Sequence, residues 1–307
     1  MSYLESLLRI PVEEVSLSRR GFHFPRELAR PILERVGEVF LQGYHAGLAD
    51  CGNDTLAARL DAVNLEFRGF AYEGAAMALD VLDQVTPWKR PRLQGFLAGP
   101  AEAHTYMAIV GIGWSLARFG FGFKRRFPKL DPLLRWLAID GWGFHEGYFH
   151  WLRYLEGHPY PRKLKGYATR AFDQGFGRSL WFVAGADPAI VASLIEQFPY
   201  LRRGDLWAGI GLACAYAGGS DPAELNSLRD FSGVWWTHLA QGSIFAAKAR
   251  SRAGNPTEHT DNACRLFAGL PAVEAAALSD LMLAHATDGP EPAYEMWRAH
   301  IRAHLSA

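Results

Sequence analysis

The chain of 307 residues is 49% hydrophobic and 21% charged, so it can bury a large core and is not expected to be disordered. Its 32 basic and 32 acidic residues leave no formal net charge, which argues against a protein that binds nucleic acid through a basic surface. The three cysteines are widely separated and form no Cys-x-x-Cys pair, so neither a disulfide framework nor a zinc ribbon is expected.

Residues 1–26 are expected to form an irregular lead-in that contains one short helix. They lack the basic start and the apolar stretch of a secretory signal. The most apolar run of the chain, residues 107–117, is far shorter than the roughly twenty residues that a helix needs to cross a bilayer. We therefore expect a cytoplasmic protein in a reducing compartment, without a membrane span.

Residues 27–307 are expected to form a single all-helical domain, and glycines recur in its first half. A pattern of glycine, large apolar residue, two variable residues, glycine or serine, and leucine begins at Gly43, Gly111 and Gly175. A second pattern has a charge, then glycine, then an aromatic residue four positions after the charge; it begins at Arg68, Asp140 and Arg203. Glycine inside a helix costs about 1 kcal/mol relative to alanine, so its recurrence predicts close backbone packing between helices. Composition alone, with 31 glycines, is the alternative explanation.

The second half carries turn signals at a constant interval. Prolines lie at positions 188, 222, 256 and 290, so that each interval is 34 residues. Small residues and glycine precede each proline, which is typical of a helix end followed by a new helix with proline in its first turn. The clearest units predicted from this spacing are 187–220, 221–254 and 255–288.

A 34-residue unit accommodates two helices and two turns, as in tetratricopeptide-type hairpins. The spacing therefore predicts an all-α fold, a tetratricopeptide-like array of helical hairpins that stacks into an α-solenoid. An α/α toroid and a two-lobed helical bundle are the alternatives. The continuous concave face of such an array is its usual binding surface.

The densest group of chemically active side chains lies at residues 140–150. Glu146 and His150 are four positions apart and can share one helix face, as in a pair of metal ligands, whereas His145 points elsewhere. The spacing is not that of His-Glu-x-x-His zinc proteases, and no second acidic pair matches it. We expect hydrogen-bonded structural histidines here, with no metal and no cofactor.

A second group combines charges with glycines and aromatic residues inside predicted helices. Buried charges are costly unless they are paired, so Arg178 could form an interhelical ion pair with Asp173 or with Asp205. Alternatively, the arginines line a pocket and bind a carboxylate, a phosphate or a polarised carbonyl group. The same two interpretations apply to Arg68 and Glu73, which flank Tyr72.

Aromatic residues make up 13% of the chain and gather near the glycines, so they could either fill the core or line a groove for a flat or polyene ligand. The candidate binding residues are Arg68, Tyr72, Glu73, Trp114, Trp142, Asp173, Trp181, Arg203 and Trp207.

Five blocks of the sequence resemble a family of proteins encoded beside enediyne polyketide synthase genes. The blocks are RGFAYEGAAM (68–77), GIGWSLAR (111–118), DGWGFHEGYF (140–149), FDQGFGRSLWF (172–182) and DLWAGIGLACAYAGG (205–219). The resemblance implies a place in such a pathway, or in a related cluster that makes another secondary metabolite. It assigns no catalytic residues.

Three functions follow as hypotheses. The first is an accessory protein that binds a hydrophobic, polyene-like intermediate or a partner enzyme of the polyketide pathway; a homodimer is an open alternative, and no nucleic-acid partner is expected. The second is an enzyme that cyclises, isomerises or oxidises such an intermediate, with a site built from His145, Glu146, Arg178 and Asp205 in which His145 or Glu146 transfers a proton. The third is a purely structural stabiliser or a self-resistance protein that sequesters the product.

Overall fold

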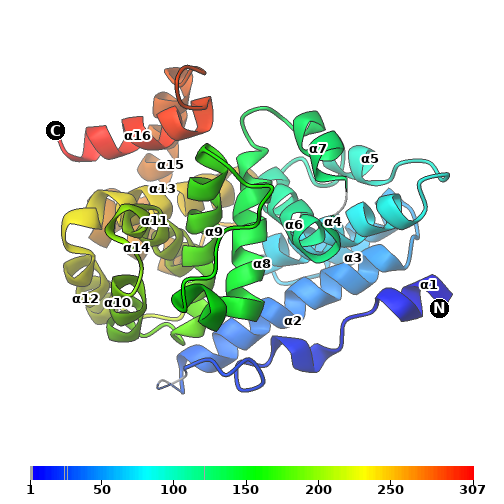
Figure 1. Cartoon of the computed structure of the whole chain (residues 1–307), viewed down its shortest axis with the longest axis horizontal. Coiled ribbons are helices and arrows are strands. Elements are labelled where there is room, and N and C mark those ends of the chain that lie inside the picture. Colours follow the sequence, from blue (N-terminus) through cyan, green and yellow to red (C-terminus); the bar gives the residue numbers. More distant parts are fainter. Residues whose placement is uncertain (1–2, 24, 26, 121) are drawn as a thin grey trace.

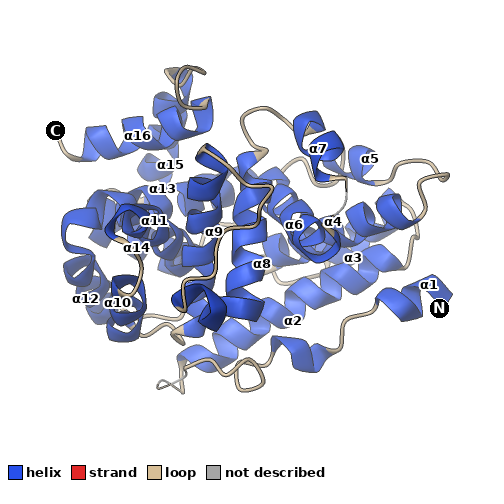
Figure 2. Ribbon diagram, viewed as in Figure 1, coloured by secondary structure: helices blue, strands red, loops and turns tan. Residues whose placement is uncertain are grey.

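The computed structural model describes residues 3–23, 25, 27–120 and 122–307, and all regular structure in these ranges is helical (Figures 1 and 2). The predicted all-α fold is therefore confirmed. Residues 1–2, 24 and 26 of the expected lead-in lie outside the described residues. No single described helix has the length and apolar character needed to span a membrane; one pair, α14 with α15, meets these criteria only together, across a bend of 64°.

A row of long helices forms the centre of the molecule. Each helix of the row packs against the next, and α11 also touches α2, so the row curls back towards its beginning. The helices of the row are α2 (Ala29–Leu48), α4 (Arg68–Val85), α6 (Thr105–Phe119), α8 (Trp136–Leu155), α9 (Tyr167–Val183), α11 (Tyr200–Ala217) and α13 (Trp236–Ala253).

Shorter helices surround this row. In the second half, α10 (Pro188–Glu196), α12 (Pro222–Ser232) and α14 (Glu258–Ala268) pack against one another as a second layer. The remaining elements are α1 (Tyr3–Leu8), η1 (Val12–Val15), α3 (Asn53–Asp61), α5 (Leu93–Leu97), α7 (Phe123–Arg126), η2 (Phe127–Lys129), η3 (Gly233–Trp235), α15 (Ala272–Ala284) and α16 (Ala293–Leu305).

The N-terminal segment runs alongside α2 (Figure 1). The Tyr44 hydroxyl of α2 donates a hydrogen bond to the Leu8 carbonyl at 2.9 Å, and the Tyr148 hydroxyl of α8 donates one to the Val15 carbonyl at 3.3 Å. The segment is therefore held by its backbone against two helices of the central row.

Two of the four predicted proline positions begin helices in the expected way. Asp187 caps α10, whose first residue is Pro188. Asp221 forms a capping box at the start of α12, whose first residue is Pro222. The prediction is wrong at Pro256, because α14 begins only at Glu258. The side chain of the preceding Asn255 instead donates to the Leu65 carbonyl at 3.2 Å, which ties the turn to the first half of the chain.

The prediction is also wrong at Pro290. Helix α16 begins at Ala293, and the carboxylate that accepts the Ala293 amide hydrogen, at 2.8 Å, belongs to Asp288. The 34-residue spacing thus predicts two of the four helix starts, and at the other two the first residue of the helix depends on which groups the turn contacts.

Close backbone packing, predicted from the recurring glycines, is confirmed. A Cβ atom at Gly175 would lie 2.5 Å from the carbonyl carbon of Asp140 in α8, and one at Gly177 would lie 2.7 Å from the Cα of Leu206 in α11. Positions two apart are separated by about 200° around a helix, so such a pair contacts the preceding and the following helix. The same arrangement recurs in α6, α8 and α11, at the pairs Gly111 and Gly113, Gly141 and Gly143, and Gly209 and Gly211.

Candidate functional site

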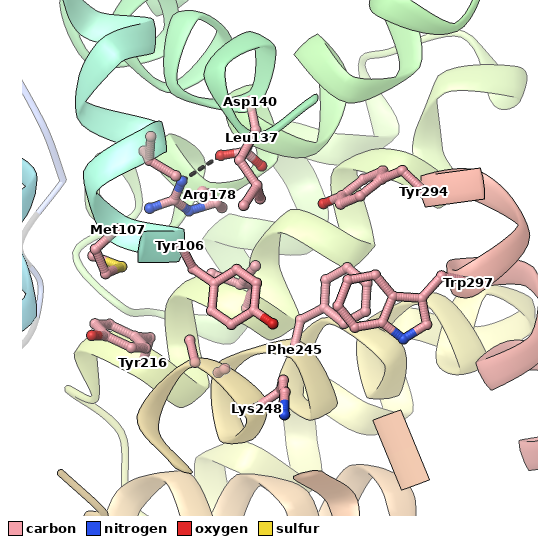
Figure 3. A pocket seen from close by; sticks show the side chains of 14 residues that line it. Tyr106, Met107, Leu137, Asp140, Arg178, Tyr216, Phe245, Lys248, Tyr294 and Trp297 are labelled. Atoms are coloured by element: carbon pink, nitrogen blue, oxygen red, sulfur yellow. Dashed lines mark hydrogen bonds and ion pairs between the residues drawn. The ribbon is translucent and has the colours of Figure 1, made fainter. Parts of the chain in front are cut away.

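Two narrow cavities lie inside the curled row of helices and meet at Arg178. The first inner cavity lies among α6, α8, α9, α11, α13 and α16, and Figure 3 shows Arg178 and Asp140 at one end of it with Lys248 at the other. The second inner cavity lies among α2, α4, α6, α8, α9 and α11. Each measures about 40 Å³, enough for a few water molecules at roughly 10–15 Å³ apiece but not for a large ligand.

Arg178 is buried between these cavities and pairs with Asp140. Both residues are at most 5% exposed. Gln174 donates a second hydrogen bond to Asp140 at 2.8 Å, and the Arg178 guanidinium lies 5.1 Å from the ring centre of Phe144. The predicted pairing of Arg178 with Asp173 or Asp205 is therefore wrong, because Arg178 points into the interior of the row, where α8 supplies the only carboxylate in ion-pair contact with it among the described residues.

Glu73 lines the second inner cavity close to this pair. It is buried, and its carboxylate accepts a hydrogen bond from the Trp114 indole nitrogen at 3.0 Å. Burial raises the pKa of Glu73 to about 7, although the charge of Arg178 and the hydrogen bond from Trp114 oppose the shift. Both protonation states of Glu73 are therefore populated at neutral pH. A buried carboxyl with such a pKa is a candidate for proton transfer.

A wider cavity of about 390 Å³ lies between the N-terminal segment and helices α4, α6 and α8. We call it the N-terminal cavity. Its volume falls within the range of about 300–1,000 Å³ that is typical of ligand sites. Met77, Trp114 and Phe149 contribute apolar surface to it, and Trp114 also lines the second inner cavity. The Trp114 side chain thus separates this space from the interior. The full lining is Arg9, Ile10, Pro11, Glu14, Arg20, Met77, Trp114, Arg118, His145, Phe149 and His150.

His145 lies in the N-terminal cavity beside Glu146, with 3.6 Å between His145 Nδ1 and Glu146 Oε1. Burial alone would raise the pKa of Glu146, but His145, His150 and the Tyr154 hydroxyl together lower it. The backbone at His150 departs from helical geometry, with φ −138° and ψ 21°, so Glu146 and His150 do not sit on one regular helix face. No group of three or more His, Cys, Asp or Glu side chains in the described ranges is placed to bind a metal.

Asp205 lies in a separate charge cluster beneath α16. Its carboxylate accepts hydrogen bonds from Arg170 at 2.9 Å and from the fully buried Arg298 at 2.7 Å. Arg298 also donates to Glu295 at 2.9 Å. Burial alone would raise the pKa of Glu295, but Arg298, Arg302 and Arg170 hold it at about 2. This cluster attaches the last helix to α9 and α11.

The four residues of the predicted catalytic site do not converge. Arg178 lies in the interior, Asp205 lies beneath α16, and only His145 and Glu146 are neighbours. The reason is that Arg178 and Asp205 are each paired with other charges: Arg178 of α9 pairs with Asp140 of α8, and Asp205 of α11 pairs with Arg170 of α9 and Arg298 of α16.

The other predicted binding residues divide into two sets. Glu73 and Trp114 come together at the cavities. The remaining ones line none of the cavities described above. Four of them donate structural hydrogen bonds: Arg68 to the Asp61 carbonyl, the Tyr72 hydroxyl to the Asp61 carboxylate, Trp181 to the Gly218 carbonyl, and Arg203 to the carbonyls of Phe198 and Glu196. Asp173 accepts hydrogen bonds from Arg202 and Tyr160, the Trp142 ring contacts that of Phe123, and Trp207 is buried.

Sequence reasoning did not single out Asp140 and Tyr216 as site residues. A signal for Tyr216 exists, because Gly141, Gly175 and Gly209 are also 34 residues apart. Residues at equal offsets from these glycines occupy equivalent positions on successive helices. Two such sets, Phe144 with Arg178 and Leu212, and Tyr148 with Phe182 and Tyr216, all line the inner cavities.

The chain belongs to the family described as "Protein of unknown function (DUF1702)", whose model matches residues 2–305. No curated protein and no solved structure matches it.

Proposed function

We propose that this DUF1702 protein is a cytoplasmic accessory protein of enediyne or related polyketide biosynthesis that binds an elongated hydrophobic, polyene-like molecule in the N-terminal cavity. The observation that carries the proposal is the 390 Å³ space walled by Met77, Trp114 and Phe149. The five sequence blocks that resemble proteins encoded beside enediyne polyketide synthases support the pathway.

The shape and chemistry of the N-terminal cavity suit a conjugated chain. The ring centres of Trp114 and Phe149 lie 6.1 Å apart and the rings meet edge to face, so two aromatic surfaces at different angles contact the same space. Flat π-systems pack well against such faces, and the flexible Met77 side chain adapts to an irregular outline. The inner cavities, at about 40 Å³ each, are too small for the same ligand.

A larger groove of about 880 Å³ lies between the α2–α3 turn and the residues before α5, but its chemistry is less suitable. No aromatic residue lines it. Its cations Lys89 and Arg92 both pair with Asp50, and Arg92 also pairs with Asp83. Arg90 also lines the groove and has no ion pair among the described residues, so the groove has a positive charge but offers no aromatic surface on which a polyene could stack.

Fluorescence titration tests the proposal. cis-Parinaric acid, a conjugated tetraene whose emission rises in apolar surroundings, is expected to bind saturably to the purified protein. Phe149→Ala is expected to weaken binding by about tenfold, because it removes one aromatic wall. Phe231→Ala is the matched control, since Phe231 is half exposed on α12 and lines none of the cavities described above. Non-saturable emission, or equal weakening by both variants, contradicts the proposal.

The second candidate function is an enzyme that isomerises or cyclises the bound molecule, and Glu73 favours it. Its carboxyl can give and take a proton near neutral pH, and its hydrogen-bond partner Trp114 also lines the N-terminal cavity. The protein would then change the tetraene absorption spectrum of parinaric acid during incubation. Glu73→Gln would abolish that change while leaving binding intact; an unchanged spectrum with the wild-type protein contradicts this function for that substrate.

A further inference from the structure

We infer that the molecule bound in the N-terminal cavity carries an anionic head group, a carboxylate or a phosphate, which is bound by Arg118 together with Arg9 and Arg20. The inference rests on the proposed function, because it assigns the polar end of the same ligand. It is carried by the charges that line the cavity and by their position relative to its aromatic wall.

The charges around the cavity do not balance. Its lining includes three arginines and one carboxylate, Glu14. Glu14 already pairs with Arg20 and with Arg19, the latter at 2.7 Å. Neither Arg9 nor Arg118 has an ion pair with a carboxylate in the described part of the chain. The cavity thus has a positive excess, and a concave, partly apolar site strengthens the field of such an excess.

The two histidines of the lining add no compensating negative charge. Glu146 does not line the cavity; its carboxylate contacts His145 and accepts a hydrogen bond from the Tyr154 hydroxyl. Burial lowers the pKa of His150, and Arg153, His145 and Arg20 lower it further against the opposing charge of Glu146. His150 is therefore mainly neutral at pH 7, and the arginines carry the permanent charge.

The arginines lie next to the apolar wall, as an amphiphile requires. Arg118 follows Trp114 by one helical turn on α6, so the two side chains leave the same face of that helix. The Arg20 guanidinium lies 4.9 Å from the ring centre of Phe149. A ligand whose chain lies against Trp114 and Phe149 therefore places its end group at Arg118 and Arg20.

Guanidinium groups suit this end group chemically. Their planar donors match the paired oxygens of a carboxylate or a phosphate. Arg9 and Arg118 are exposed at the rim, where they keep their charge and can reorient without disturbing the core. An alcohol or a hydrocarbon end would leave the positive excess uncompensated.

The test compares parinaric acid with its methyl ester, which has the same tetraene and no charge. The acid is expected to bind about tenfold more tightly than the ester, a difference that shrinks as salt is added. Arg118→Met is expected to weaken binding of the acid by about the same factor and to leave binding of the ester unchanged. Arg162→Met is the matched control, since Arg162 is exposed, forms no ion pair in the described chain and lies outside the cavity.

The outcomes separate the two proposals. Equal affinity of acid and ester, or equal weakening of both by Arg118→Met, overturns the anionic head group and leaves the hydrophobic site standing. Failure of both probes to bind overturns the proposed function itself. Displacement of the bound ester by dodecanoate or by dodecyl phosphate, but not by dodecanol, supports the inference and shows which anion is preferred; equal displacement by dodecanol contradicts it.

Discussion

Replacing Gly175 by alanine is expected to destabilise the protein, although alanine is the better helix former. A methyl group at this position in α9 would lie 2.5 Å from the carbonyl carbon of Asp140 and 2.8 Å from its Cα, whereas ordinary contact begins at 3.4 Å. These are backbone atoms of α8 and cannot rotate away, so the two helices must separate. Overpacking costs up to about 3 kcal/mol and helix propensity returns about 1 kcal/mol, which leaves a net loss of about 2 kcal/mol.

Urea unfolding followed by far-ultraviolet circular dichroism measures this loss. The matched control is Gly95→Ala in α5, where a methyl group would meet only the side-chain amide of Asn53, at 3.1 Å. That flexible group can move, so the control is expected to be neutral or stabilising by up to about 1 kcal/mol. A Gly175→Ala protein as stable as the wild type, or a control that loses as much, would refute the argument from close helix packing.

Two further predictions concern buried charges. Arg298→Ala is expected to lower the free energy of unfolding by about 3–5 kcal/mol, because it leaves the carboxylates of Asp205 and Glu295 buried with fewer partners. The control Arg265→Ala removes an exposed i, i+4 ion pair and is expected to cost less than about 1 kcal/mol in the same urea experiment. Similar losses in the two variants would contradict the role of burial. Because the pKa of Glu73 is raised from 4.5 to about 7, its contribution to stability is present below about pH 4.5 and is lost as the pH rises through 7. Melting temperatures from pH 5 to pH 8 are therefore expected to fall less steeply in Glu73→Gln than in the wild type, and parallel curves would show that Glu73 does not titrate in this range.

Local chemistry was sufficient to predict much of the fold. Aspartate followed by proline at 187–188 and at 221–222 begins a helix because the cap and the missing amide hydrogen act within one turn. The signal at Asn255 looks similar but fails, because its side chain donates to Leu65, a residue far away in the sequence. No pattern near residue 255 contains information about that contact.

The candidate site was only partly predictable for a related reason. Arg178 was recognised as a charge that must be paired, and Trp114 and Glu73 as members of a site, but the partner of Arg178 was not identified. Asp140 precedes Gly141, which faces the neighbouring helix, and this register brings its carboxylate to Arg178. Reading the glycine pairs at their 34-residue interval would have aligned the lining positions of successive helices.

The amino-acid pattern alone established that the chain is helical, that its units repeat, and that glycines let the helices approach closely, since each of these depends on residues near one another in sequence. Which charges pair, and the existence of a cavity beneath the N-terminal segment, emerged only from the folded arrangement. Those features depend on how far each helix is rotated and shifted against its neighbours, and that is set by the packing of the whole row.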